Sequence, residues 1–263
     1  MKLGLGSAME LLLPGDSLAA ICGCRFRVLT LAPYPSWLVS SMVATAFAAQ
    51  RASMLDLDRL RATPLNRDPF DYLVVPTFIH ADALGAINAD YPAIEKSGSF
   101  PLAEVKFGPA FGELVEQLNG DEFRCAIEEK FSIDLTGRPT MVTVRGRCSE
   151  KDGRIHTDSL TKIITVLIYV NRNWEEGGGR LRLLRSATDL DDLVAEVPPA
   201  EGTLLAFRRS DNSWHGHKPF SGPRRVIQFN WVTSQSVVNR ELKRHRFSAW
   251  TKKLRGIFGR HKI

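Results

Sequence analysis

The stretch Ile-Ile-Thr-Val-Leu-Ile-Tyr-Val at residues 163–170 decides the fold class. β-Branched and aromatic residues dominate it, and it ends at Asn171, a turn former, which is typical of a buried strand. Similar short stretches with turn residues between them cover residues 141–145, 180–184, 202–207 and 226–232. Such a succession of short strands predicts a β-sandwich or jelly roll.

Helical patterns come before this run of strands. Residues 72–79 predict one early strand, residues 81–90 a short helix, and residues 109–118 and 121–131 two amphipathic helices. Because the helices precede the strands instead of alternating with them, the expected class is α+β, with N-terminal helices supporting one sheet.

The positive charge is concentrated at the C-terminus. The 263-residue chain has a net charge of +6, but residues 240–263 hold nine Lys/Arg and one Glu, a net of +8. The rest is near neutral, so nucleic-acid binding is not expected. Residues 239–258 predict a basic amphipathic helix with apolar residues at helical spacing, namely Phe247, Trp250, Leu254 and Ile257/Phe258. This tail either docks on the domain or binds an anionic membrane surface.

The expected domain boundaries follow from composition. Residues 1–53 contain an apolar stretch that Pro33 and Pro35 interrupt, and they are interpreted as a poorly structured extension or a misassigned start, with Met54 as the alternative start. Residues 54–238 are the expected catalytic domain, with a β core at about 140–233, and residues 239–263 the tail. No apolar run reaches the ~20 residues that span a bilayer.

Cysteine usage gives one expectation about the compartment. Four cysteines in a chain of this length do not make a disulfide scaffold, and no second Cys/His pair follows Cys22-Gly-Cys24 at zinc-finger spacing. We interpret them as incidental thiols and expect a cytoplasmic protein, peripheral to the membrane if the tail binds there.

Two short segments carry residue types that bind metals. His156-Thr157-Asp158 places an imidazole and a carboxylate at i and i+2, which share one face if the segment is a strand. Ser213-Trp214-His215-Gly216-His217 adds a second imidazole. Two His and one carboxylate leave open positions on the opposite face of the ion, as in non-haem iron(II) sites. We expect His156, Asp158 and His215 to be the ligands, with His217 as the alternative to His215.

A pair of arginines precedes the last strand. The guanidinium group is a planar fork that binds a carboxylate through two parallel hydrogen bonds. Residues 225, 227, 229 and 231 share one face of the strand and are Arg, Ile, Phe and Trp, whereas residues 224, 226, 228 and 230 are Arg, Val, Gln and Asn. We take the apolar face to be the inward one. Arg225 is therefore the expected anion-binding residue and Arg224 the outward one.

Together these elements resemble the iron(II)- and 2-oxoglutarate-dependent oxygenase superfamily, and most of all its prolyl-hydroxylase-like branch. Residues 165–171, with Trp174 and the Gly-Gly pair at 178–179, are similar to the strand, loop and turn of that branch. The resemblance covers about residues 140–233 and, more loosely, extends back to 71. Residues 145–148 lack the tyrosine that prolyl hydroxylases often carry there, so the resemblance does not extend to a peptidyl-proline substrate.

The resemblance implies a cupin-like double-stranded β-helix and a hydroxylase. His156, Asp158 and His215 would bind iron(II), Arg225 would hold the distal carboxylate of 2-oxoglutarate, and Tyr169 would add a hydrogen bond to it. The reaction would consume O₂ and release succinate and CO₂, with ascorbate as a candidate further cofactor.

The sequence leaves the substrate and two alternative functions open. The substrate could be a peptide side chain, a glycan or lipid headgroup, or a small metabolite. One alternative is a non-catalytic jelly-roll module that binds a metal or a glycan. The other is a zinc- or manganese-dependent cupin-like enzyme. Neither needs an anion-binding arginine beside an open metal site.

Overall fold

A computed structural model describes residues 53–175, 177–200 and 202–244. The predicted extension before residue 53 and the predicted tail helix beyond residue 244 lie outside these residues. Residues 235–244, where the tail begins, are helical. No helix in the described part is both long and apolar enough to cross a membrane.

The helices precede most of the strands, as predicted. The three predicted helices are α3 (Ala81–Ala89), α4 (Pro109–Leu118) and α5 (Asp121–Phe131). Pro109 begins α4, where its missing N–H leaves no hydrogen bond unmade. Acidic residues in the first turn of α5 stabilise the helix, because their negative charge lies at the positive end of its dipole. The sequence pattern does not predict the short α2 (Leu57–Ala62) or the 3-10 helix η1 (Leu102–Glu104).

Nine strands are described, and they include all six that the sequence predicts, one at residue 72 and five downstream of Pro139. They are β1 (Tyr72–Val75), β2 (Phe100–Pro101), β3 (Thr140–Cys148), β4 (Lys162–Tyr169), β5 (Leu181–Leu184), β6 (Leu193–Val197), β7 (Thr203–Arg208), β8 (His215–Gly216) and β9 (Gly222–Val232). β1 is shorter than predicted because Pro76 cannot donate to a strand ladder and Thr77 has a φ of 51°.

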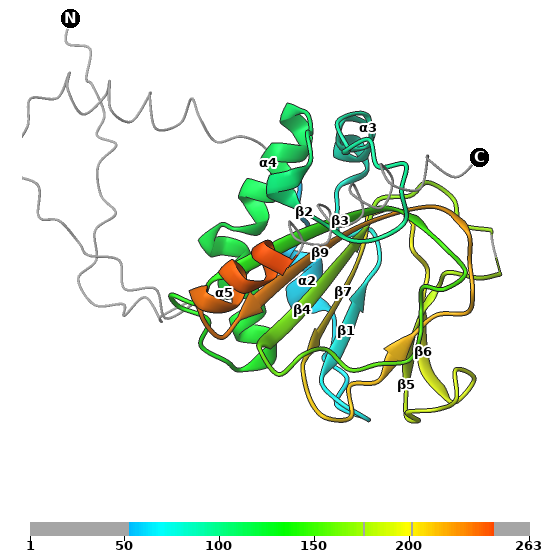
Figure 1. Ribbon diagram of the computed structural model, residues 1–263. Coiled ribbons are helices and arrows are strands. Elements are labelled where there is room, and N and C mark those ends of the chain that lie inside the picture. The colour runs from blue at the N-terminus through cyan, green and yellow to red at the C-terminus, as the bar shows by residue number, and fades with distance from the viewer. Residues whose placement is uncertain (1–52, 176, 201, 245–263) are drawn as a thin grey trace, which may run out of the picture. The chain divides into compact units, whose positions relative to one another are not determined.

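The strands form two antiparallel sheets (Figure 1). One has six strands in the order β1-β7-β4-β9-β3-β2, and the other has three in the order β6-β5-β8. In the large sheet Leu167 of β4 is paired with Leu205 of β7 on one side and Gln228 of β9 on the other. This mixed architecture is consistent with the predicted jelly-roll fold.

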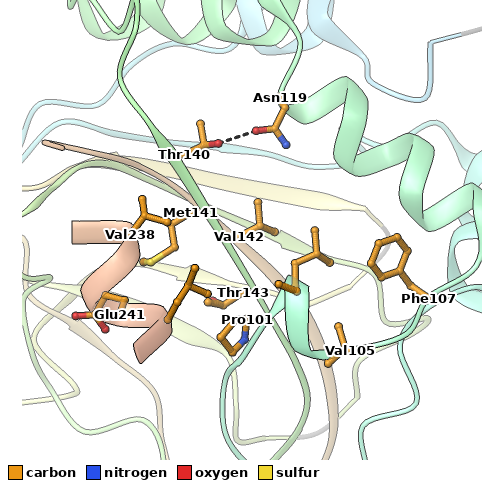
Figure 2. A pocket seen from close by; sticks show the side chains of 13 residues that line it. Pro101, Val105, Phe107, Asn119, Thr140, Met141, Val142, Thr143, Val238 and Glu241 are labelled. Carbon is orange, nitrogen blue, oxygen red and sulfur yellow. Dashed lines mark hydrogen bonds between the residues drawn. The ribbon is translucent and has the colours of Figure 1, made fainter. Parts of the chain in front are cut away.

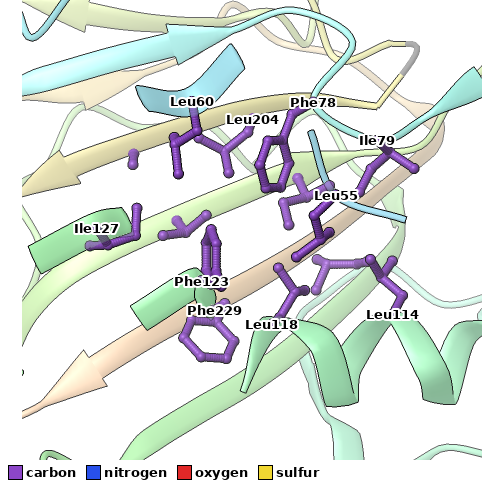
Figure 3. Close-up of a cluster of buried hydrophobic side chains, with 14 of the residues drawn as sticks. Leu55, Leu60, Phe78, Ile79, Leu114, Leu118, Phe123, Ile127, Leu204 and Phe229 are labelled. Carbon is purple, nitrogen blue, oxygen red and sulfur yellow. The ribbon is translucent and has the colours of Figure 1, made fainter. Parts of the chain in front are cut away.

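The helices cover one face of the large sheet, and the main core lies between the helices and that face. Figure 3 shows side chains of α4 and α5, among them Leu118 and Phe123, facing Leu204 of β7 and Phe229 of β9. Phe123 stacks on Trp231 with ring centroids 5.8 Å apart. Burying a Phe or Leu side chain stabilises the fold by ~1.5–3 kcal/mol. The apolar residues of β9 are therefore held on this helix-covered face.

A second cluster fills the space between the two sheets. It consists of side chains from the opposite face of the large sheet and from the small one, including Tyr169, Leu205, Phe207, Val226, Leu181, Leu183 and Val197. Alternation along β4 explains the division, since Ile164, Val166 and Ile168 belong to the helix-covered core and Tyr169 to the other cluster. The polar site opens from this second, inter-sheet side.

Candidate metal centre

Backbone hydrogen bonds place His156 directly opposite His215. Each N–H donates to the other residue's carbonyl oxygen at 3.0 Å, and the two imidazole centroids are 4.3 Å apart. Asp158 follows two residues later, and the ligand atoms of the three side chains all lie within 4.8 Å of one another. His156 forms an isolated bridge in an extended segment instead of the predicted strand. The three predicted ligands nevertheless converge.

Both imidazoles are oriented by bonds to carbonyl oxygens. The Nδ1 of His156 lies 2.9 Å from the carbonyl oxygen of Arg154, and the Nδ1 of His215 lies 2.9 Å from that of Ser213. A carbonyl cannot donate, so each Nδ1 carries the proton and each Nε2 presents a lone pair. Burial lowers the pKa of His215 to about 4, so this imidazole is neutral at pH 7. Neutral imidazole is the form that binds metals.

Asp158 is a buried carboxylate with partners on both oxygens. The ammonium group of Lys162 donates to Oδ1 at 2.6 Å, and the hydroxyl of Thr165 donates to Oδ2 at 2.5 Å. Burial alone would raise the pKa of this carboxyl, but the charge of Lys162 and the hydrogen bonds from Lys162 and Thr165 bring the pKa below its ordinary value. Asp158 is therefore ionised at neutral pH. Two imidazoles and one carboxylate form a donor set that fits non-haem iron(II).

The sequence reasoning missed Lys162 and Thr165. The signal for Thr165 is its place in the apolar run 163–170, because a buried hydroxyl needs a hydrogen-bond partner. Lys162 stands just before that run and carries no comparable signal.

A recess of about 140 Å³ opens beside the three ligands. Arg145, His217 and Arg224 also line it. Arg145 is paired with Asp152 at 3.1 Å. Arg224 is only 4% exposed, and no acidic side chain in the described part forms an ion pair with it. A buried guanidinium without a carboxylate is costly, so the recess is suited to a small anion.

The prediction that Arg225 lies in the site is wrong, and Arg224 occupies that place. Arg225 points towards α3, where its Nη1 donates to the Asn88 backbone oxygen at 3.0 Å and to Oδ1 of the same residue at 2.9 Å. Its guanidinium also lies over the Tyr91 ring. The apolar face of β9 packs against the helices and not against the inter-sheet space. The more polar face, with Arg224 and Gln228, therefore lines the recess.

The sequence of this region matches the profile of the 2OG-Fe(II) oxygenase superfamily over residues 146–233. That range includes His156, Asp158 and His215 and extends through Arg224 to the end of β9. This part of the chain is similar to the 2OG-Fe(II) oxygenase superfamily.

Solved structures similar to this chain include a prolyl-4-hydroxylase from Pseudomonas putida, at 18% identity and a TM-score of 0.47, covering 67% of this chain and 90% of that one. A prolyl 4-hydroxylase from Phytophthora capsici is also 18% identical, with a TM-score of 0.46 and coverages of 72% and 69%. HygX from Streptomyces hygroscopicus with iron bound is 12% identical, with a TM-score of 0.45 and coverages of 64% and 85%. Comparison with curated protein sequences gave no match. These likenesses say nothing about the substrate.

Tyr169 contacts Arg224 from the inter-sheet core. It is fully buried, and its hydroxyl accepts a long hydrogen bond of 3.4 Å from the Arg224 guanidinium, whose central carbon is 5.2 Å from the ring centroid. The Nε of Arg224 donates to the Gly179 carbonyl at 2.7 Å. Tyr169 is not among the residues that line the recess. Its predicted hydrogen bond to a co-substrate stays a prediction, whereas its contact with Arg224 is observed.

His217 lines the recess, but its ring is held elsewhere. Its Nδ1–H donates to the Lys218 carbonyl at 2.8 Å, and a Cβ at Gly153 would come within 2.4 Å of this nitrogen. Ligand atoms of His156, Asp158 and His215 converge without it. Among the described residues, the geometry therefore favours His215 over His217 as the distal ligand.

A second recess, of about 290 Å³, also reaches the ligands. It shares His156, Asp158 and Gln228 with the basic recess and extends to Lys162, Thr143 and Glu241. The candidate metal centre is thus shared by a small recess lined by arginines and a larger one. Two separate approaches suit a reaction that needs a small co-substrate and a substrate at one metal.

Proposed function

We propose that the protein is an iron(II)- and 2-oxoglutarate-dependent dioxygenase that hydroxylates a C–H bond of its substrate. The observation that carries this proposal is a centre of two His and one carboxylate that shares a small recess with Arg224, a buried arginine without an acidic partner in the described part. A structural zinc site would use four protein ligands. A module that only binds a metal has no need of an arginine there.

Each residue of the site then has a role. His156, Asp158 and His215 hold the metal, and Lys162 and Thr165 orient the Asp158 carboxylate. Arg224 binds the distal carboxylate of 2-oxoglutarate, and Tyr169 and the Gly179 carbonyl fix its guanidinium. When bound, iron(II) and 2-oxoglutarate activate O₂, giving succinate and CO₂ and placing one oxygen atom in succinate and the other in the hydroxylated substrate.

The two sheets are proposed to be the two halves of a double-stranded β-helix. The protein is further proposed to belong to the prolyl-hydroxylase-like branch, to use ascorbate and to be cytoplasmic. The basic residues 240–263 are proposed to be attracted to an anionic membrane surface, which their charge supports. The substrate is a peptide side chain, a glycan or lipid headgroup, or a small metabolite.

The choice of metal tests the proposed function against its alternatives. We expect the full chain to convert 2-oxoglutarate to succinate when loaded with Fe(II) in the presence of O₂, and not when loaded with Zn(II) or Mn(II) or when O₂ is removed. Succinate is measured by mass spectrometry, with metal content determined on the same samples. Protein that binds Fe(II) and 2-oxoglutarate but forms no succinate with O₂ would indicate a non-catalytic binding module.

A further inference from the structure

The large sheet has an open edge at the start of β3. β9 pairs with β3 from Thr140 onwards, but on the other side β2 pairs only with Thr143 and Val144. No residue of the described ranges pairs with Thr140–Val142 on that side. Exposed edges of this kind invite pairing with another chain, and proteins usually protect them.

The hydrogen-bonding groups at this edge point outwards. The Val232 N–H donates to the Pro139 carbonyl, so these two residues form a hydrogen-bonded pair. Opposite residues in an antiparallel ladder alternate between bonded and non-bonded pairs. The backbone N–H and C=O groups of Thr140 and Val142 therefore face away from β9 and into the space beside the sheet.

An apolar groove of about 530 Å³ lies along this edge. Figure 2 shows Met141 beside Val238 on one side of β3, and Val142, Val105 and Phe107 on the other. Phe107 is 41% exposed, which is unusual among the large apolar side chains of the described part. Successive side chains of a strand added here would point alternately towards these two apolar walls.

The groove is continuous with the approach to the metal. Met141, Thr143 and Glu241 line both the groove and the second recess, which contains His156 and Asp158. A chain lying in the groove therefore ends next to the recess that holds His156 and Asp158.

We propose that this groove binds an extended apolar peptide segment, which pairs with Thr140–Val142 as an added strand and leads a peptide substrate to the metal centre. An aliphatic chain would fill the apolar walls equally well, but it would leave the outward backbone groups of Thr140 and Val142 unpaired. Strand addition uses both features, with main-chain bonds supplying affinity and the walls selecting side chains. The assignment of the peptide as a substrate rests on the proposed function, whereas its binding does not.

The spacing of the strands also indicates how far the hydroxylated residue of the peptide lies from the segment that docks in the groove. Neighbouring strands are ~4.8 Å apart, so a strand added to β3 lies three spacings, roughly 14 Å, from β4, which begins shortly after Asp158. An extended chain advances ~3.3 Å per residue. The hydroxylated residue is thus about four or five residues away from the docked segment.

The test uses the full chain and an array of random dodecapeptides. The best-binding peptide is remade in two forms, each with alternate backbone amides N-methylated. One form loses the donors that face β3, and the other loses only outward donors. We expect the first form to bind about tenfold or more weakly and the second to bind like the parent peptide, by fluorescence anisotropy. Hydrogen exchange followed by NMR should show the Val142 amide slowed at least about tenfold by the parent peptide.

A pair of side-chain variants provides the matched control. Phe107→Ser in the groove is expected to weaken peptide binding, whereas Leu160→Ser, at a 75%-exposed apolar residue away from the groove, leaves it unchanged. Three results would overturn the proposal: no peptide of the array binds, both methylated forms bind equally well, or the Val142 amide exchanges slowly before any peptide is added. Succinate formation is measured separately, so failure of peptide binding and failure of the proposed function are distinguished.

Discussion

Arg224→Lys is expected to raise the dissociation constant for 2-oxoglutarate by about 10- to 100-fold. The change keeps the positive charge but removes the planar fork and the Nε–H that anchors it to the Gly179 carbonyl. A hydrogen bond to a charged group contributes ~1.5–3 kcal/mol, and each 1.4 kcal/mol corresponds to a tenfold change in affinity. Anaerobic isothermal titration calorimetry of the iron-loaded protein measures the effect.

Arg225→Lys is the matched control for this change, since it makes the same substitution one residue along the strand. Arg225 faces α3 and bonds Asn88, so its replacement should leave the affinity for 2-oxoglutarate nearly unchanged and act only on thermal stability. Equal losses in the two variants, or a larger loss for Arg225→Lys, would show that Arg224 is not the anion-binding residue.

Asp158→Ala is expected to abolish stable iron binding and reduce succinate formation to background. The change removes a ligand and leaves the Lys162 ammonium without its 2.6 Å partner beside the metal centre. Loss of an outer partner of a ligand typically costs ~10–100-fold in metal affinity or activity, and loss of the ligand itself costs more. Metal content by mass spectrometry and succinate formation are measured on the same preparation.

Two comparisons show whether this loss is specific. Asp134→Asn changes an exposed carboxyl on the loop after α5 and should leave metal content and turnover as they are. His215→Ala should resemble Asp158→Ala, whereas His217→Ala should have a much milder effect. Full turnover by Asp158→Ala would remove this residue from the site, and a greater loss for His217→Ala than for His215→Ala would move the distal ligand.

Periodicity in the sequence was sufficient for α4 and α5 and for the grouping of residues along β9. Residues 109–118 and 121–131 are helical with the predicted bounds, and residues 225, 227, 229 and 231 do share a face. Alternation cannot say which face of a strand meets the helices. The inter-sheet side holds the polar centre, so the apolar face of β9 packs in the helix-covered core instead. The prediction therefore assigned the inward position to Arg225, whereas Arg224 occupies it.

The partners of the metal ligands depend on contacts between distant segments. The convergence of His156 and His215 could be expected from residue types, but the reciprocal backbone bonds that join them link positions 59 residues apart. Lys162 reaches Asp158 because β4 begins at this lysine, and the edge at Thr140–Val142 is open because β2 ends at Pro101. Those bounds depend on tertiary pairing and leave little trace in local sequence.

Labelling with ¹⁸O₂ tests the central claim most directly. The iron-loaded full chain is incubated with 2-oxoglutarate under ¹⁸O₂, and the succinate is examined by mass spectrometry. The account predicts one ¹⁸O atom in each succinate, one CO₂ released with it, and no labelled succinate from Asp158→Ala. Succinate without ¹⁸O, or labelled succinate formed equally by Asp158→Ala, would contradict an oxygenase reaction at His156, Asp158 and His215.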